Sequence, residues 1–426
     1  MNTFINPLKN EWNEIIRRPQ INNAALKNIV SKILLDVKQN GDEAVKRYSL
    51  QFDGVELTNL KVNEKEIQGA LLVVNDELKN AIQLAKENIE KFHLSQKEEI
   101  KIIETSAGVK CWRRSVAIEK VGLYIPGGTA PLFSTLLMLG IPAVMAGCRE
   151  IIVCTPADKN GKVNPVILYV AHRLGIKNIY KIGGIQAIAA MAYGTETIQS
   201  VYKIFGPGNQ YVTTAKQIIS SEGIAIDMPA GPSEVAVYAD ADCNPAFVAS
   251  DLLSQAEHGV DSQVFLVAAS QQIVDNVKKE IGQQLNLLSR KEIIEKSLVN
   301  SRFVIMKNVD NAFDLLNEYA AEHLIIASGK AELLSEKVIN AGSVFLGNYS
   351  PESAGDYASG TNHTLPTNGY AKAYSGVSLD SFVKKITFQK FKKEGLKNIG
   401  NAIELMAAAE GLDAHKNAVS IRLKNL

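Results

Sequence analysis

The chain has 426 residues, of which 46% are hydrophobic and 21% charged, and its formal net charge is +1. This composition is that of an ordinary globular protein, and the near-zero charge, with both signs mixed along the chain, argues against nucleic acid as a partner. Four cysteines without a C-x-x-C pair argue against a disulfide scaffold and favour a reducing cytoplasm. The first residues, "MNTFINPLKNEWNEIIRRP", lack the apolar core of a signal peptide.

The N-terminal region is predicted to be helical. Apolar residues recur at helical spacing in "AALKNIVSKILLDVKQNG", where Gly41 is expected to end the helix. Asn63 is expected to cap a long amphipathic helix that continues to residue 96. His93, in this second helix, and His172 lie among lysines or arginines, so we expect both to be solvated and assign them no role.

One segment, 121–148, contains no charged residue and is long enough to span a bilayer. Prolines interrupt it, however, and its pattern predicts a strand "EKVGLYIP", a loop "GGTAP", a buried helix "LFSTLLMLGIPAVMAG" and then the strand "REIIVCTP". A unit of this kind that is buried on both faces accounts for the missing charges without lipid. We therefore expect no membrane partner.

From about residue 110 onward, short β-rich runs alternate with helical patterns. The runs are "EIIVCTP", "NIYKIGG", "SVYKIFGPG", "EVAVYAD", "QVFLVAAS", "RFVIMKN", "HLIIAS" and "GSVFLGN". This alternation is typical of an α/β protein with largely parallel sheets. The charged tail after Phe382 is predicted to be helical again, as a small separate lobe or an arm that reaches a second subunit.

Three strands run into glycine-bearing turns: "YIPGG" at 124–128, "KIGGIQA" at 181–187 and "FGPGNQYV" at 205–212. In open α/β sheets ligands bind beyond the carboxyl ends of the strands, and glycines let a ligand approach the backbone. None of the three is a G-x-G-x-x-G fingerprint. Each alone fits a simple tight turn, but the three together favour a nucleotide-sized cleft.

The stretch "SQAEHG" places Gln255 and His258 three residues apart on a predicted helix, so their side chains share a face. Taken alone, the stretch also fits a helix end, with His258 near the C-terminal carbonyls and Gly259 as a left-handed cap. In "EYAAEHLIIAS", Glu322 and His323 end a helix and open a strand. This dipeptide fits a helix-terminal charge pair or, alternatively, a general-base pair.

Two further stretches combine histidine with a carboxylate. The loop "SPESAGDYASGTNHTLP" contains His363 and Asp356, which is either a hard metal ligand or the aspartate of a turn. In "AAAEGLDAHKNAVSIRL", Asp413 is expected to cap a helix whose first turn carries His415, alone a surface histidine. Together, two nitrogens and two oxygens suit zinc in a site open to substrate; these ligands are Gln255, His258, Asp356 and His415.

At this point the motifs identify a family. "GPGNQYV", "AGPSE", "SQAEHGVDSQ", "EHL", "AGDYASGTNHTLPT" and "EGLDAHKNAV", in this order, closely resemble histidinol dehydrogenases. The resemblance implies a zinc- and NAD-dependent, four-electron oxidation of L-histidinol through L-histidinal to L-histidine, the last two steps of histidine biosynthesis. It implies one Zn²⁺ per subunit, NAD as the cofactor, L-histidinol as the substrate, and a cytoplasmic homodimer.

The resemblance also implies a role for individual residues. The predicted catalytic pair is Glu322 and His323. The predicted zinc ligands are Gln255, His258, Asp356 and His415, the last donated by the partner subunit of a domain-swapped homodimer. The predicted substrate contacts are Ser233, His363 and Glu410, together with the zinc ligands and His323, and the predicted NAD contacts are Tyr124, Gln186 and Asn209. One departure is Ala321, where the family usually has proline before the Glu-His pair.

The implied fold class is α/β, with two incomplete Rossmann-like domains and small helical N- and C-terminal lobes. The expected boundaries are an N-terminal arm 1–23, a discontinuous first α/β domain 24–123 and 235–378 with the zinc and catalytic residues, a second, NAD-binding α/β domain 124–234, and a C-terminal helical lobe 379–426 that is swapped in a dimer.

Three alternatives remain open at this point. A zinc-dependent hydrolase of small amides would turn over without nicotinamide, although the sequence lacks H-E-x-x-H. A non-enzymatic metal or ligand carrier would bind without turnover. Within the dehydrogenase hypothesis, a thiohemiacetal on Cys148, next to Arg149, is a rival route for the second oxidation, although a cysteine that ends an apolar helix is more often buried and inert.

Overall fold

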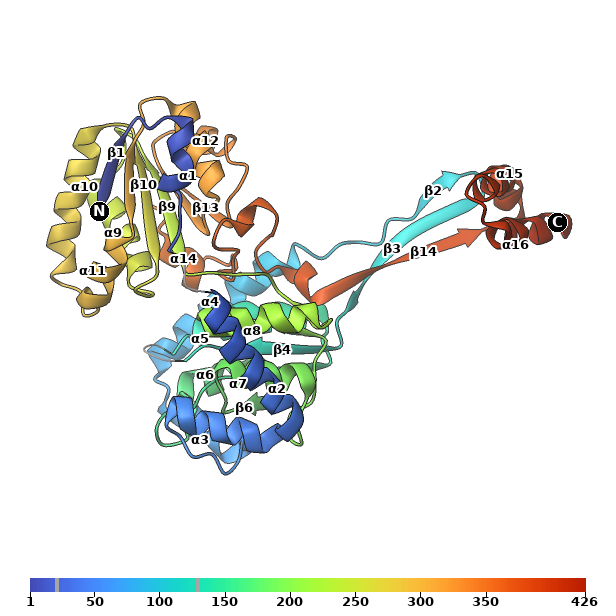
Figure 1. Cartoon of the computed structure of the whole chain (residues 1–426), viewed down its shortest axis with the longest axis horizontal. Helices are drawn as coiled ribbons and strands as arrows, with labels where there is room; N and C mark the ends of the chain where they lie inside the picture. The colour runs from blue at the N-terminus through green and yellow to red at the C-terminus, as the bar shows by residue number, and fades with distance from the viewer. Residues whose placement is uncertain (20–22, 128–130) are drawn as a thin grey trace.

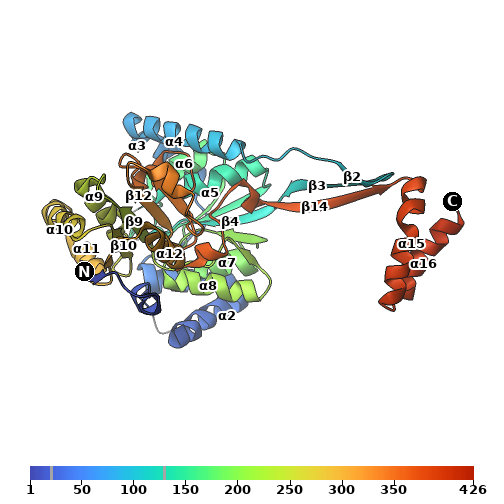
Figure 2. The same ribbon diagram turned by 90° about the horizontal axis from the view of Figure 1, so that it is seen from above.

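The computed structural model describes residues 1–19, 23–127 and 131–426, without the side chains of residues 23 and 24. Most of the predicted "GGTAP" loop, and the last residue of the "YIPGG" turn, lie outside the described residues. Two α/β bodies lie side by side, and a long arm extends away from them with two helices at its tip (Figure 1). Figure 2 shows the same arm from above.

The first body is built on a six-stranded sheet in which every neighbouring pair of strands is parallel. Its strands, in spatial order, are β1 (Asn2–Ile5), β11 (Arg302–Ile305), β10 (Gln263–Ala268), β9 (Glu234–Ala239), β12 (His323–Ala327) and β13 (Ser343–Leu346). Five of these are strands predicted from the apolar runs. β1 was not predicted.

Helices cover both faces of this sheet: α1 (Trp12–Ile15), α9 (Pro245–Ala256), α10 (Gln271–Leu285), α11 (Lys291–Val299), α12 (Val309–Tyr319), α13 (Ala331–Ser335) and α14 (Glu352–Tyr357). In β9, Val235 and Val237 face one buried cluster, while Ala236 and Tyr238 face the other. Because both faces are buried, the strand has no polar alternation, which explains the continuous apolar run in the sequence.

The second body has a five-stranded parallel sheet. Its spatial order is β6 (Asn178–Tyr180), β5 (Glu150–Cys154), β4 (Lys120–Tyr124), β7 (Lys203–Phe205) and β8 (Ala225–Ile226). Numbered by chain order within the body, this is 3-2-1-4-5, the order of a Rossmann-type sheet, with its switch point between β4 and β7. The α/β fold with largely parallel, Rossmann-like sheets is therefore confirmed, although the sequence has no G-x-G-x-x-G motif.

Seven helices among the described residues cover the five-stranded sheet: α2 (Asn23–Tyr48), α3 (Glu64–Val73), α4 (Asp76–Leu94), α5 (Phe133–Ala146), α6 (Pro165–Arg173), α7 (Gly184–Tyr193) and α8 (Gln210–Ser221). Apolar residues of α2, α3 and α4 join its two core clusters. We had expected the segment 24–123 to pack with 235–378. In this packing it lies mainly with 124–234. Its amphipathic helices cover a sheet that follows them directly in the chain.

The N-terminal helices match the sequence pattern except at two breaks. Helix α2 bends at Gly41, whose φ is 49°, and continues to Tyr48, so the predicted helix end is a kink. Asn63 caps α3 as predicted, and its side chain accepts from the backbone N–H of Glu66. The long run then divides because Asn75 caps a second helix, α4.

His93 corrects one expectation. Its side chain is fully buried, and its Nδ1 lies 2.9 Å from the carbonyl oxygen of Ile89. Burial lowers the pKa of His93 and favours the neutral ring. The neighbouring lysines therefore lie on the opposite, solvated face of α4, whereas His172 is exposed as predicted.

The uncharged segment 121–148 forms β4 and the buried helix α5, as predicted. Among the described residues, no helix combines the length and the apolar character that a membrane span requires. The four cysteines are free thiols.

The arm is a three-stranded antiparallel ribbon of β14 (Val383–Phe391), β3 (Val109–Ala117) and β2 (Ile103–Ser106), followed by α15 (Lys393–Ala409) and α16 (Asp413–Lys424). The prediction of helix directly after Phe382 was wrong, because β14 pairs along its full length with β3. The alternation in "VKKITFQKF" fits this strand, and Trp112 stacks on Phe388 across the pair. The two helices predicted further along the tail are present.

Candidate active site

Most of the predicted metal and catalytic residues meet at one edge of the six-stranded sheet. His323 is the first residue of β12, and Glu234 is the first residue of the neighbouring β9. Helix α9 follows β9 and returns to this edge, where it carries Gln255 in its last turn and His258 just beyond its end. The site therefore lies at the amino ends of the parallel strands.

The end of α9 differs from the simple helix cap considered above. The helix ends at Ala256, and its cap residue, Glu257, is right-handed. Gly259 is absent from the residues with positive φ, so it is not a left-handed cap. Gln255 is buried, whereas His258 is exposed.

Glu322 and His323 form a close pair where the chain enters β12. His323 Nδ1 lies 3.8 Å from Glu322 Oε2, and His323 Nε2 lies 3.5 Å from Asp356 Oδ1. The Glu322 carboxylate also accepts a hydrogen bond from the backbone N–H of Glu234 at 3.0 Å. The imidazole is therefore held between two carboxylates that are far apart in sequence.

Burial and neighbouring charge shift the protonation of this pair. Burial raises the pKa of Glu322 to about 8, although the nearby His323 opposes the shift. Burial alone would lower the pKa of His323, but Glu322 and Asp356 outweigh it and raise that pKa to about 10. The pair thus holds a carboxyl group near the neutral range, where general acid–base groups work best.

A third carboxylate was missed by the sequence analysis. His258, Glu352 and Asp356 each offer one ligand atom, and these three atoms lie within 4.8 Å of one another. Asp356 lies in the short helix α14 and not in the irregular loop that we expected. Glu352 and Asp356 are four residues apart on this helix, the spacing that places two side chains on one face; that spacing was the available signal.

The buried Glu352 fixes the neighbouring amide of Gln255. The surrounding groups assign the orientation of the Gln255 amide: its nitrogen donates to the two Glu352 carboxylate oxygens at 3.2 and 2.7 Å, and its oxygen accepts at 2.9 Å from the Glu234 backbone N–H, which also donates to Glu322. Because the nitrogen is engaged by a carboxylate, the oxygen, with a second lone pair, is the atom left for a further partner.

These residues fit a divalent cation. Burial raises the pKa of Glu352 well above its ordinary value, and the charges of Asp356 and Glu322 raise it further. A cation between such carboxylates and an imidazole would remove this repulsion, and the donor set of oxygen and nitrogen suits zinc or a similar ion. The local chemistry therefore supports a metal site, although four ligands do not converge within one copy of the chain.

His415 and Glu410 are the predicted site residues that are not brought together with the others. Both are exposed at the tip of the arm, His415 in the first turn of α16 and Glu410 just after α15. Figure 1 shows these helices far from the six-stranded sheet. The expected cap Asp413 is instead the first residue of α16, after Leu412.

Two predicted substrate contacts lie beside the metal cluster. Ser233 immediately precedes Glu234 at the start of β9, and both it and His363 are half-buried. His363 Nε2 is a buried nitrogen without a hydrogen-bond partner among the described residues. Burial lowers the pKa of His363, and the charge of Asp356 opposes this shift. An uncharged imidazole with a free nitrogen can receive a donor from a ligand.

The predicted cofactor residues lie in the other body, at the carboxyl ends of the strands of the five-stranded sheet. The metal and catalytic residues, in contrast, lie at amino ends. Tyr124 ends β4, and its hydroxyl accepts a 3.1 Å hydrogen bond from the backbone N–H of Gly184. Gln186 lies in the first turn of α7, and its buried Oε1 has no partner among the described residues. Asn209 caps α8 by accepting from two backbone N–H groups.

Glycine allows the close approaches at this edge. A Cβ on Gly206 would collide with the carbonyl oxygen of Tyr124, and the φ of Gly206 is 130°. The Gly206 backbone is held by a buried ion pair: its N–H donates to Asp227, and its carbonyl accepts from Lys216 at 2.8 Å. The N-termini of α7 and α8 also lie here, as an anionic dinucleotide requires. The donor and acceptor chemistry therefore fits a dinucleotide.

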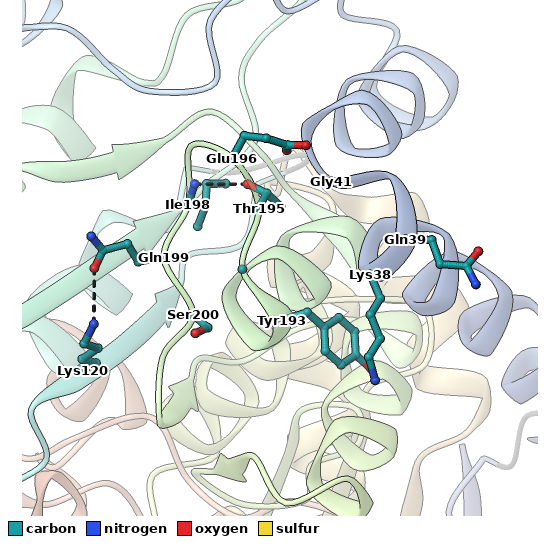
Figure 3. A pocket seen from close by; sticks show the side chains of 11 residues that line it. Lys38, Gln39, Gly41, Lys120, Tyr193, Thr195, Glu196, Ile198, Gln199 and Ser200 are labelled. Carbon is teal, nitrogen blue, oxygen red and sulfur yellow. Dashed lines mark hydrogen bonds between the residues drawn. The ribbon is translucent and has the colours of Figure 1, made fainter.

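A separate surface hollow does not belong to either group. It has a volume of about 600 Å³ and lies at the amino edge of the five-stranded sheet, opposite the cofactor residues. Figure 3 shows Lys120, at the start of β4, and the loop after α7 on its wall. Glu196 accepts from the backbone N–H of Asp42 beside the Gly41 kink.

Cys148, the rival nucleophile, is held as a thiol. It lies directly after α5 and is half-buried, and burial raises its pKa to about 11. Arg149 points elsewhere, with its guanidinium 4.0 Å from Glu119. Within the described part of the chain, no cation stabilises a thiolate at Cys148, which weighs against a thiohemiacetal route.

Comparison with known proteins gives a consistent result. A sequence model of the histidinol dehydrogenase family matches residues 16–423. The chain is 60% identical over 420 residues to the histidinol dehydrogenase of Bacteroides thetaiotaomicron, covering 99% of this chain and 98% of the relative. It is 51% identical to that of Colwellia psychrerythraea over 97% of this chain and 96% of the relative. The crystal structure of histidinol dehydrogenase from Elizabethkingia anophelis, at 58% identity, superposes with a TM-score of 0.97 and covers 100% and 98% of the two chains.

Proposed function

The chain belongs to the histidinol dehydrogenase family, and we propose that it oxidises L-histidinol through L-histidinal to L-histidine in a zinc- and NAD-dependent reaction, the last two steps of histidine biosynthesis. The observation that carries the proposal is the convergence of a glutamate–histidine pair with the cluster of His258, Glu352 and Asp356 at one edge of a sheet. The free cysteines support a cytoplasmic location for this reaction.

Zinc would be held by Gln255, His258 and Asp356, with His415 supplied by a second copy of the chain. When bound, zinc supplies a template that anchors the imidazole and amine of the amino alcohol and fixes its carbinol carbon. Glu352 would support the site by accepting from the amide nitrogen of Gln255, and the amide oxygen, which also accepts from the backbone N–H of Glu234, would be the ligand atom. Ser233, His363 and Glu410 would complete the contacts to substrate.

NAD would be bound by Tyr124, Gln186 and Asn209 at the carboxyl edge of the second sheet, and it supplies the acceptor for hydride. Oxidation of the alcohol removes one hydride and one proton, and oxidation of the hydrated aldehyde removes one more of each. Two NAD molecules are therefore reduced for each histidinol, and two protons must leave through residues of the protein.

His323 would take those protons once a bound cation offsets the carboxylate charges of Asp356 and Glu352, which otherwise keep its ring protonated at neutral pH. Its ring is held between Glu322 and Asp356 at 3.8 and 3.5 Å, so its orientation is set before substrate arrives. Glu322 would take a proton from the water that hydrates the aldehyde. Burial places its pKa near 8, so a carboxylate strong enough to accept that proton is available at neutral to mildly alkaline pH. The buried surroundings would also protect the reactive aldehyde from bulk water.

The arm supports a homodimer. Helices α15 and α16 pack mainly on each other, and no residue of α16 is buried. Leu405, Met406, Leu412 and Ile421 are all exposed by 43% or more at its tip. A second copy would cover these apolar side chains and receive His415 and Glu410 into its own site.

Mixed dimers test this arrangement. Neither His415→Ala nor His258→Ala homodimers should turn over, because each lacks a ligand at both sites. A mixture that exchanges subunits should regain activity, because one of its two sites then contains a full ligand set. If the mixture stays inactive while native mass spectrometry shows mixed dimers, sharing of the site is wrong.

The proposed reaction is tested by incubating the purified protein with Zn²⁺, NAD⁺ and L-histidinol and following NADH absorbance. We expect two NADH per histidinol consumed, and loss of the signal after chelation that returns with added Zn²⁺. Release of product from small amides without nicotinamide would favour the hydrolase alternative. Tight zinc binding with no turnover of either kind would favour a carrier.

A further inference from the structure

Asp53 lies beside the predicted cofactor residues, although it is far from them in sequence. It is the last residue of the short π-helix η2 (Ser49–Asp53), which directly follows helix α2. Gly54 comes next in a left-handed conformation. The carboxylate accepts a weak, 3.5 Å hydrogen bond from Gln186 Nε2. This contact brings a carboxylate to the carboxyl edge of the five-stranded sheet.

Around Gln186 and Asp53, the hydrogen-bond acceptors outnumber the donors. The Nε2 group of Gln186 is turned toward Asp53, and its buried Oε1 is left without a donor. Among the described residues, the contact with Gln186 is the one hydrogen bond of the Asp53 carboxylate, which can therefore accept further donors. Among the described residues, the pKa of Asp53 is raised by burial alone, with no cation near enough to oppose that effect. A ligand that fits must therefore bring hydroxyl or amine donors.

The position in the sheet indicates which part of a dinucleotide would supply these donors. Gln186 follows β6, the third strand in the 3-2-1-4-5 order. In dinucleotide-binding sheets of this order, a carboxylate about 20 residues after the first glycine-rich turn accepts from the ribose 2′-hydroxyl. Asp53 would supply the same group from a segment that precedes the first strand, β4. A ribose diol supplies two neighbouring O–H donors, which match the free oxygens of Asp53 and Gln186.

We propose that Asp53 is a specificity-determining residue, which accepts a hydrogen bond from the adenosine ribose and thereby selects NAD over NADP. This inference rests on the proposed function, because it assumes that the edge binds a dinucleotide. A 2′-phosphate would place up to two further negative charges against a half-buried carboxylate that no lysine or arginine of the described residues neutralises. Selection therefore arises from attraction for one ligand and repulsion of the other.

The test is equilibrium binding of NAD⁺ and NADP⁺ to the full-length protein and to Asp53→Asn. A hydrogen bond to a charged acceptor corresponds to a change of about 10- to 100-fold, so NAD⁺ should bind weaker by about that factor. NADP⁺ should bind no weaker than before, so the preference for NAD⁺ should fall by at least the same factor. The dissociation constant for Zn²⁺ should not change.

The matched control is Asp42→Asn. Asp42 is also a buried carboxylate of the α2 segment that accepts from a side chain, Thr197 Oγ1 at 3.1 Å, but it lies at the other edge of the sheet. Its replacement should leave both dinucleotide affinities unchanged. Circular dichroism melting of both variants verifies that they fold.

The outcomes separate the two levels of the proposal. Wild-type protein that binds NAD⁺ far tighter than NADP⁺, with Asp53→Asn keeping that preference, would overturn the role of Asp53 and leave the proposed function intact. Wild-type protein that binds neither dinucleotide would contradict the proposed function and the role of Asp53 together. Equal effects of the Asp53 and Asp42 variants would mean a structural role only.

Discussion

The two parallel sheets of this protein present their candidate sites at opposite edges. On the five-stranded sheet, Tyr124, Gln186 and Asn209 lie at the carboxyl ends of strands. On the six-stranded sheet, His323 starts a strand, and Gln255 lies at the end of a helix that returns to the amino ends. The general expectation that ligands bind beyond the carboxyl ends therefore applies to only one of the two.

Helix dipoles explain the difference. At the carboxyl edge of a parallel sheet the following helices begin, and their positive N-terminal ends attract an anionic dinucleotide. At the amino edge the same kind of helix ends, and its negative carbonyl end favours a cation. α7 and α8 present their first turns to the proposed NAD site, whereas α9 presents its last turn to the proposed zinc site. The sign of the charge on the proposed ligand therefore matches the helix ends that lie at each edge of the sheet.

The largest effect is expected when one ligand of the proposed zinc site is removed and the proposed NAD site is left intact. Asp356→Ala should abolish zinc binding and lower kcat/KM about a thousandfold or more, because a bound metal supplies several kcal/mol to the reaction. NAD⁺ affinity should stay unchanged, because no cofactor residue is altered. Zinc content by atomic absorption and NAD⁺ titration check both halves, and a parallel loss of NAD⁺ affinity would contradict two separable edges.

A second change divides the reaction within the amino-edge site. Glu322→Gln should slow the aldehyde-to-acid step by about a hundredfold or more, as expected for loss of a general base, and spare the alcohol-to-aldehyde step far better. The measurement is NADH formation from histidinol and from histidinal separately. Glu318→Gln, an exposed glutamate on α12, is the control. Equal losses in both half-reactions would remove the hydration role from Glu322.

A smaller effect is expected when the residue that orients a proposed zinc ligand is altered. Glu352→Gln removes the carboxylate that holds the Gln255 amide, and zinc affinity should fall by about 10- to 100-fold, the usual cost of losing an outer-shell partner. Competition with a chromophoric chelator measures the change, with Glu318→Gln again as the control. An unchanged zinc affinity would mean that the amide is oriented by the backbone of Glu234 alone.

The smallest effect is expected at Cys148. Because burial raises the pKa of this thiol to about 11, almost no thiolate exists at neutral pH. Cys148→Ala should therefore leave kcat for both half-reactions unchanged. A selective loss of the aldehyde-to-acid step, in a variant that melts at the same temperature as the wild type, would restore the thiohemiacetal route.

Much of the fold was visible in the sequence because its signals are local. The eight apolar runs are all strands, and Asn63 caps a helix as its position before an amphipathic segment predicts. The two strands that were missed or mistaken for helix, β1 and β14, share one cause, which is a pairing partner far away in the chain. β1 is a strand because it lies beside β11, and β14 because it lies beside β3, some 270 residues earlier.

The candidate site divides in the same way. The motifs named Glu322, His323, Gln255 and Asp356, and the structure brings these four close to one another. Glu352 was missed because its four-residue spacing from Asp356 is a signal only on a helix, and the polar, glycine-rich stretch was expected to be a loop. In the proposed dimer, the placement of His415 at the site depends on a second copy of the chain.

The sequence by itself determined which chemical groups the protein has and where its strands and helices run, because side-chain chemistry and apolar periodicity are properties of short segments. Only the tertiary structure decided that the candidate metal-binding side chains meet at the amino ends of the strands of one sheet. It also decided that Glu352 holds the amide of Gln255, and that Asp53 contacts Gln186, which is 133 positions away in the chain. Convergence of this kind depends on strand order and on the direction of each helix, and these are set by packing over the whole chain.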